Sequence, residues 1–357
     1  MAEKVAFGTV RTLASGRFQA RYLTDGKQVS AGTFRTAREA WKALAAIQTD
    51  LDRGEHVAAD AGRVTFAQHA EAVLEHRKGD LRDSTLRNYR QFLRVQLNPT
   101  FGRMALADIS VQDVDRWWSR WSDKPGARKN AYMVGSMVFR YAMRWQLVKS
   151  SPFMVEKAGA DPSKKRPTFT ANDFRSVVAH APLELGAAFW VLFGAHLRVA
   201  EVAGLNRGDY DPKTKTKTLN VVRQYASNGP RALTPTKTGN HKRVKLLAPA
   251  VAALEAHLAS TTGAPFSPMF TGVSGARMAP RIIQDAFAKA RTAAGHPGMH
   301  VHDARHIGLT LVAQSGVASL RDVMARAGHT TVQASVRYLH TSPEQDAKVA
   351  AAVDAIL

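Results

Sequence analysis

The chain has 357 residues, of which 50 are Lys or Arg and 29 are Asp or Glu, so its formal net charge is +21. Such an excess indicates a polyanionic partner, because Lys and Arg neutralise phosphates and release condensed counterions. The absence of cysteine excludes disulfides, thiol catalysis and cysteine-ligated zinc. Neither the first residues nor the longest apolar run, 187–197, matches a signal peptide or a membrane span, so we expect a cytoplasmic protein of two or three domains.

The first element expected is a small sheet. Residues 5–34 alternate apolar and polar side chains, as half-buried strands do, with glycine-containing turns at 15–16 and 25–26. This pattern predicts three short antiparallel strands. Arg17 and Arg21 lie on the polar face of the second strand, which could enter a DNA major groove. An ordinary solvated strand face is an equally good interpretation.

A helix follows the strands. Thr36 with Glu39 has the spacing of a capping box, and an apolar stripe from Trp41 to Leu51 follows. We therefore expect an N-terminal domain, residues 1–55, in which one helix braces a three-stranded sheet.

Residues 52–63 lack periodicity and predict a linker. Beyond it we expect a helical domain, residues 64–154, built from amphipathic helices. One opens at Thr65 with Gln68, one opens at Ser84 or Thr85 and is ended by Asn98-Pro99, one covers 111–121 and one covers 129–147.

Basic side chains recur along one of these expected helices, at Arg87, Arg90 and Arg94. They are candidates for contact with DNA phosphates, and the alternative is an ordinary charged helix face. The large net positive charge favours DNA. A basic, proline-containing hinge at 155–167 then separates the helical domain from a third domain, residues 166–357.

Arg198 interrupts the apolar sequence AAFWVLFGAHLRVAEVAGL. A buried charge is costly unless it has a partner, and Glu201, three residues later on the same helical face, could supply one. One interpretation is a purely structural ion pair. The other is that Arg198 points into an anion pocket while Glu201 orients it.

A small sheet is predicted next, because residues 217–224 and 241–247 alternate apolar and polar side chains. Lys237 lies in a turn-like TKTG segment between them, and Lys242 and Lys245 compete with it for any functional role. Further helices follow, the last of them opened by Pro280-Arg281.

The segment 300–340 gathers His, Arg and Tyr in an apolar helical background. His302 and Arg305 stand three apart and share one face of a helix, and Gly328 is expected to end a helix. That break would let His329 and Tyr338 face the same pocket. Arg and His suit phosphate oxygens, and Tyr can act as a nucleophile once its proton is removed.

These residues carry a resemblance. The sequence HDARH at 302–306, AGH at 327–329 and Tyr338 nine positions after His329 resemble the second box of the tyrosine recombinases, the phage integrase family. The sequence LRVAEVAGL at 197–205 resembles the first box of the same family, although His196 stands where that family often has Gly.

The resemblance implies catalytic roles for Arg198, Lys237, His302, Arg305 and His329, with Tyr338 as the nucleophile. It also implies a multidomain, mainly α fold with small β-sheets: an N-terminal three-stranded sheet plus helix that binds arm-type DNA, a helical core-binding bundle, and a mixed α+β catalytic domain of the tyrosine recombinase and type IB topoisomerase type. Lambda-type integrases have such an N-terminal arm-binding domain.

The expected reaction is attack of Tyr338 on a DNA phosphodiester, which makes a 3′-phosphotyrosyl link and frees a 5′ hydroxyl, with Lys237 as general acid. The cationic side chains would stabilise charge on the non-bridging oxygens. We expect no cofactor and no metal. The implied partners are double-stranded DNA at attachment sites, further copies of the chain in a synaptic tetramer on DNA, and DNA-bending or directionality factors. The implied location is the cytoplasm of a bacterial host, at the nucleoid, where the protein would integrate a phage or mobile element.

Three alternatives remain at this point. A chromosome-dimer resolvase would use the same chemistry without the N-terminal arm domain. A metal-dependent phosphohydrolase could use His300, His302, Asp303 and His306, since His residues four apart can bind zinc on a helix, although the arginines would repel a cation. A non-catalytic DNA-binding regulator fits the charge but leaves Arg198 and Tyr338 unexplained.

Overall fold

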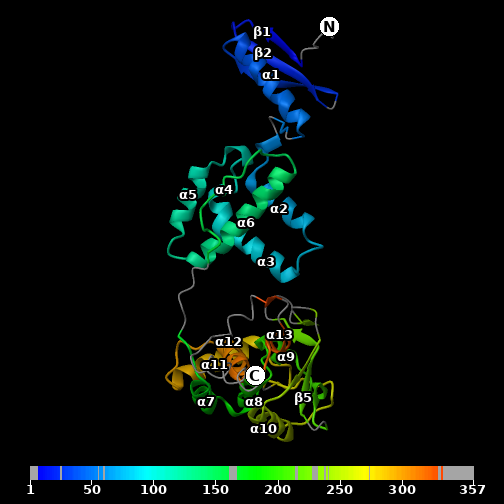
Figure 1. Ribbon diagram of the computed structural model, residues 1–357, viewed down its shortest axis with the longest axis vertical. Coiled ribbons are helices and arrows are strands. Elements are labelled where there is room, and N and C mark those ends of the chain that lie inside the picture. Colours follow the sequence, from blue (N-terminus) through cyan, green and yellow to red (C-terminus); the bar gives the residue numbers. More distant parts are fainter. Residues whose placement is uncertain are drawn as a thin grey trace, which may run out of the picture. The chain divides into compact units, whose positions relative to one another are not determined.

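The computed structural model describes residues 7–24, 26–54, 56–58, 61–160, 167–213, 216–226, 232–236, 239, 241–272, 274–328 and 331–332 (Figure 1). The chain separates into two compact units, Met1–Lys164 and Lys165–Leu357. Each unit has hydrophobic cores of its own. None of the helices in the described ranges is long and apolar enough to cross a lipid bilayer.

The first unit begins with the predicted three-stranded antiparallel sheet. It consists of β1 (Thr9–Thr12), β2 (Phe18–Thr24) and β3 (Lys27–Phe34), in that order. Gly16 and Gly26 stand at the turns with φ of +72° and +71°, a backbone conformation that costs a side chain-bearing residue more than glycine. The strand prediction for residues 5–34 is therefore confirmed for the described residues.

Helix α1 (Ala37–Asp52) packs on this sheet (Figure 1). Its capping box is present as predicted, since the Thr36 hydroxyl accepts from the Glu39 N–H and the Glu39 carboxylate accepts from the Thr36 N–H. The prediction for Trp41 was wrong, because its side chain is 43% exposed. The other predicted members of the stripe, Leu44, Ile47 and Leu51, do pack in this core, and Ala40 joins them in place of Trp41, which lies about 100° further around the helix.

The helical bundle also belongs to the first unit. Its helices are α2 (Phe66–His76), α3 (Asp83–Phe92), α4 (Asn98–Phe101), α5 (Val111–Arg120) and α6 (Pro125–Arg144). They enclose a core rich in aromatic side chains, among them Phe66, Phe101, Trp117 and Phe139. The predicted helices at 65, 111–121 and 129–147 are thus present, with ends shifted by a few residues.

Asn98-Pro99 does not end the third predicted helix. Residues Leu93–Leu97 form a π-helical turn between α3 and α4, and Pro99 lies in the first turn of α4. Proline is tolerated there, because a first-turn N–H has no partner within the helix. The carbonyl of Gln96, in this turn, accepts a hydrogen bond from the Trp117 indole N–H at 2.8 Å.

The second unit combines helices with two small antiparallel sheets (Figure 1). Its helices are α7 (Ala171–Ala179), α8 (Leu183–Gly194), α9 (Val199–Gly204), α10 (Ala248–Ala259), α11 (Pro280–Ala293), α12 (Val301–Gln314) and α13 (Leu320–Ala327). One sheet has the order β4 (Tyr210–Asp211), β5 (Thr218–Val221), β8 (Lys242–Lys245), and the other pairs β6 (Arg223–Tyr225) with β7 (Leu233–Pro235).

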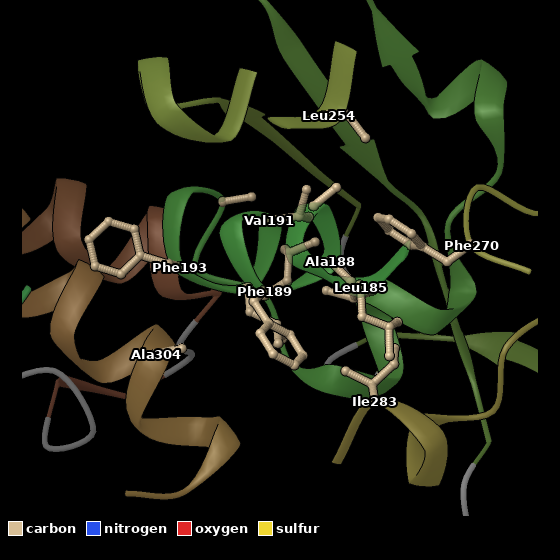
Figure 2. Close-up of a cluster of buried hydrophobic side chains, with 14 of the residues drawn as sticks. Leu185, Ala188, Phe189, Val191, Phe193, Leu254, Phe270, Ile283 and Ala304 are labelled. Atoms are coloured by element: carbon tan, nitrogen blue, oxygen red, sulfur yellow. The ribbon is translucent and has the colours of Figure 1, made fainter. Parts of the chain in front are cut away.

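Helix α8 is the centre of this unit. Apolar side chains cover it on nearly every side, which is typical of a fully buried helix. Figure 2 shows Phe189 and its neighbours on α8 among side chains from three other helices, represented by Leu254 of α10, Ile283 of α11 and Ala304 of α12. The predicted class, mainly α with small sheets and an N-terminal sheet plus helix, is confirmed.

A glycine sets the distance between α8 and α12. A Cβ on Gly308 would lie 2.4 Å from the carbonyl oxygen of Phe193 and 2.8 Å from Cδ2 of His196. These separations are far below van der Waals contact, so only glycine allows the two helices to approach this closely. The approach brings Arg305, one turn before Gly308, to the end of α8.

Candidate active site

A short non-helical segment, which contains Arg198, separates α8 from α9. The residues from Ala195 to Leu197 leave the helix, and His196 adopts a left-handed conformation with φ of +55°. This conformation is uncommon for residues other than glycine. Arg198 then becomes the N-cap residue of α9, so its side chain leaves the apolar core in which the sequence places it.

Glu201 is the partner of Arg198, as predicted. Nη1 of Arg198 donates to Oε1 of Glu201 at 2.8 Å, and the Arg198 backbone N–H donates to Oε2 at 2.8 Å. The Glu201 side chain is only 4% exposed, and a buried carboxylate requires such compensation. Glu201 therefore fixes both the backbone and the guanidinium of Arg198.

Arg305 reaches the same carboxylate from α12. Its Nη1 lies 3.9 Å from Oε2 of Glu201 and donates to the backbone carbonyl of His196 at 2.5 Å. Its Nη2 donates to the carbonyl of Ala327, at the end of α13. The side chain is 1% exposed, so Arg305 joins α9, α12 and α13 beneath the site.

A cavity of about 440 Å³ opens beside this cluster. Basic side chains line part of it, namely Arg198, His241, Lys242 and Arg243, together with Glu201, Thr236 and the end of α13. Arg305 is not among the lining residues. Lys242 of β8 lines the cavity together with Arg198.

The amine of Lys242 donates to the carbonyls of Ala195 and His196, at 3.2 and 3.3 Å. Burial, and then the positive charge of Arg305, lower the pKa of Lys242 to about 7. Arg198 and Arg326 lower this pKa further, while Glu201 raises it. Cations thus outnumber carboxylates around this amine, and an anion in the cavity would be attracted by them.

The ring of His196 lies behind the cavity and is completely buried. Its Nδ1 is 3.4 Å from Nη1 of Arg326. Burial, followed by the charges of Arg326, Lys242 and Arg305, holds the pKa of His196 well below its usual value. At neutral pH this imidazole is therefore uncharged.

His302 lies on α12 with an exposed side chain. Its ring packs edge-on against that of His306, with 4.5 Å between centroids. Asp303 caps α12 by accepting from the His300 N–H at 2.6 Å. Within the described ranges, no three His, Asp or Glu side chains gather as metal ligands, so the phosphohydrolase alternative has no geometric support in that part of the chain.

Three predicted site residues, Lys237, His329 and Tyr338, lie outside the described residues. The predicted helix end before His329 is confirmed, since α13 ends at Gly328 with φ of +63°. Sequence analysis assigned no definite role to Lys242, which the structure places at the cavity. Strand alternation could have indicated that Lys242 points inward, because it lies on the same strand face as the buried Val244.

The arginines predicted to bind DNA belong to the first unit. Arg17, Arg87, Arg90 and Arg94 are exposed and Arg21 is half-buried. Arg90 forms an ion pair with Glu71 at 2.5 Å, and Arg94 donates to Gln91 at 2.7 Å. Their contact with DNA stays a prediction.

Known proteins resemble this chain along most of its length. The phage integrase family matches residues 167–345, the phage integrase N-terminal domain matches residues 6–53, and the phage integrase N-terminal SAM-like domain matches residues 65–122. The putative prophage phiRv2 integrase of Mycobacterium tuberculosis is 28% identical over 97% of this chain and 94% of its own length. The integrase of Mycobacterium phage L5 is 28% identical over 97% of both chains.

Solved structures show the same fold. The Tn1549 transposon integrase in complex with transposon right end DNA superposes with a TM-score of 0.70 over 82% of this chain and all of that chain, at 16% identity. The lambda integrase dimer bound to a COC′ core site superposes with a TM-score of 0.63 over 95% of this chain and 97% of that chain, at 16% identity. Because its family matches half of the chain and its fold agrees, this chain belongs to the phage integrase family.

Proposed function

We propose that this protein is a site-specific tyrosine recombinase that cuts and rejoins double-stranded DNA at attachment sites and integrates a phage or mobile element. The observation that carries the proposal is the meeting of Arg198 and Arg305 at the carboxylate of Glu201, beside a cavity lined by basic side chains. Arg198 at the cavity wall and Arg305 buried beneath it make this place positive, which suits a phosphodiester, whose charge grows on its non-bridging oxygens during transfer.

In the proposed reaction the phenol oxygen of Tyr338 attacks the scissile phosphorus in line. A 3′-phosphotyrosyl bond forms, the bond from phosphorus to the 5′ oxygen breaks, and Lys237 gives a proton to that oxygen. Arg198, His302, Arg305 and His329 stabilise the developing charge. The covalent bond conserves the energy needed for rejoining, so the reaction requires neither a nucleotide nor a metal ion.

We infer three domains: an arm-type DNA-binding domain at 1–55, a core-binding domain at 64–154 and a catalytic domain at 166–357. Arg17 and Arg21 would contact DNA from the first domain, and Arg87, Arg90 and Arg94 from the second. The family matches at 6–53 and 65–122 support this division. The first of them also favours an integrase over a chromosome-dimer resolvase, which acts without an arm domain.

Partners follow from the same proposal. Related structures are described as a lambda integrase dimer on a core site and a lambda integrase tetramer bound to a Holliday junction. We propose that this chain likewise forms a homo-oligomer on DNA, a synaptic tetramer, and works with DNA-bending or directionality factors. Such a protein would act at the bacterial nucleoid.

The test is a covalent adduct. The protein is first incubated in excess EDTA with a plasmid library of host genomic fragments. The protein is then denatured, and the DNA that stays attached to it is sequenced. Nicked duplexes of that sequence serve as substrates that trap the covalent intermediate. We expect an adduct from the wild type and from Tyr225→Phe, and none from Tyr338→Phe, which should still bind the duplex. An adduct formed by Tyr338→Phe would refute the assignment of the nucleophile, and a wild type that forms none in any duplex would refute the proposed function.

A further inference from the structure

Lys242 is a basic residue of the cavity to which the reaction as described above gives no role. We propose that the side chain of Lys242 binds the scissile phosphate together with Arg198 and holds it for attack. This inference rests on the proposed function and adds a second lysine to the site, distinct from the predicted proton donor Lys237.

The strand register places Lys242 at the cavity. In β8, which pairs antiparallel with β5, Lys242 lies opposite Val221 and Val244 lies opposite Leu219. Residues two apart on a strand point to the same face, and Val244 is buried. Lys242 therefore points inward, whereas Arg243 and Lys245, on the other face of the strand, are exposed.

The amine of Lys242 is oriented but not saturated by its described neighbours. An ammonium group has three N–H donors. Two of them reach the carbonyls of Ala195 and His196, and Lys242 also lines the cavity. These two carbonyls fix the nitrogen at the cavity wall, where the remaining donor can reach a phosphate oxygen.

The surrounding charges make this amine responsive to an anion. The charged groups that act on it come from each element packed around it: Arg198 and Glu201 from α9, Arg305 from α12 and Arg326 from α13. Burial and the three arginines favour the neutral amine and lower its pKa to about 7. A phosphate offsets the arginine charge, so the amine takes up a proton from solvent as the phosphate enters.

The competing explanation is that Lys242 only braces the break between α8 and α9 through its two hydrogen bonds. A brace and a phosphate ligand differ in two measurable ways. Loss of a brace slows adduct formation only as far as it destabilises the fold, whereas loss of a phosphate ligand slows it beyond any change in thermal stability. A phosphate ligand also contributes a titration to the reaction, whereas a brace does not.

The experiment measures the rate of adduct formation on the nicked duplex from pH 6 to pH 9, and the thermal midpoint, for four proteins. These are the wild type, Lys242→Met, Lys242→Arg and the control Lys245→Met, whose side chain is exposed on the same strand. We expect Lys242→Met to slow adduct formation by about 10²-fold or more at temperatures where the variant remains folded. Lys242→Arg, which cannot lose its charge, should retain most of the rate and lose the decline above pH 7 to 8 shown by the wild type. Lys245→Met should stay within about two-fold of the wild type.

Two outcomes would overturn the inference. One is adduct formation by Lys242→Met at the wild-type rate. The other is a slow Lys242→Met that is also markedly less stable, combined with a Lys242→Arg variant that keeps the wild-type pH profile, because this pattern identifies a brace. Both require an active wild type, so they are distinct from failure of the proposed function, in which the wild type itself forms no adduct.

Discussion

Arg305 and Lys242 donate to the same backbone carbonyl, that of His196, although they come from α12 and β8. The carbonyl faces both cations because His196 has a left-handed backbone conformation, with φ of +55°. One peptide group thus aligns two basic side chains, one beneath the cavity and one at its wall.

Glu201 holds both arginines, so its charge should be required for stability. Glu201→Gln keeps the shape of the side chain but leaves Arg198 and Arg305 without their shared carboxylate. Breaking a buried ion pair by removing one partner costs about 3–5 kcal/mol, and we expect a loss of this size in the free energy of unfolding by urea. Glu184→Gln is the matched control, because Glu184 is exposed on α8. Equal stability of the two variants would show that Glu201 does not carry the cluster.

His196 should make stability depend on pH. Its pKa is lowered in the folded protein and ordinary, about 6.5, in the unfolded chain. Below pH 6.5 the unfolded chain binds more protons, so the free energy of unfolding decreases as pH falls, by up to about 1.4 kcal/mol per pH unit for this group. This stability is fully present above pH 6.5.

His196→Asn should flatten that dependence. Asn tolerates a left-handed backbone better than most residues and does not titrate. We expect the free energy of unfolding by urea, measured between pH 5 and pH 7.5, to change less steeply with pH for the variant than for the wild type. Identical slopes would mean that folding does not lower the pKa of His196.

Two glycines should respond to alanine in opposite directions. In Gly308→Ala the new methyl group would meet the Phe193 carbonyl and the His196 ring, so overpacking should cost about 1–3 kcal/mol and move Arg305. In Gly186→Ala the methyl group meets nothing within 4 Å on α8, so a gain of up to about 1 kcal/mol is expected from helix propensity. Thermal unfolding measures both. A neutral Gly308→Ala would contradict the close approach of α8 and α12.

Trp117 should be needed for the π-helical turn. Trp117→Phe keeps an aromatic ring in the core but removes the N–H that donates to the Gln96 carbonyl. Leaving a buried acceptor unpaired costs about 1–3 kcal/mol, which urea unfolding of the protein would reveal as a lower free energy of unfolding. A change below about 0.5 kcal/mol would show that the carbonyl finds another donor.

Local features of this protein were predictable from the sequence because their physical causes are local. The capping boxes at Thr36 and Thr65 lie within four residues of chain, and both are present. The glycine turn at Gly16 and the helix end at Gly328 depend on the backbone freedom of a single residue.

The features that escaped prediction depend on distant parts of the chain. Lys242 faces the cavity because β8 pairs with β5, a long-range register that spacing cannot reveal. The π-helical turn at Leu93–Leu97 is satisfied by an indole from α5. The sequence predicted Arg305 as a phosphate ligand. It could not predict that the guanidinium is buried and donates hydrogen bonds to the carbonyls of His196, after α8, and Ala327, at the end of α13.

The hydrogen bond from Arg305 to the Ala327 carbonyl links the end of α13 to the arginine cluster. Ala327 is the last residue of that helix, and Gly328 follows it in a left-handed conformation. Whatever path the chain takes from residue 329 onward, it departs from a point attached to the arginine. A displacement of the guanidinium would therefore be transmitted, through one hydrogen bond, to the place where the remaining thirty or so residues begin.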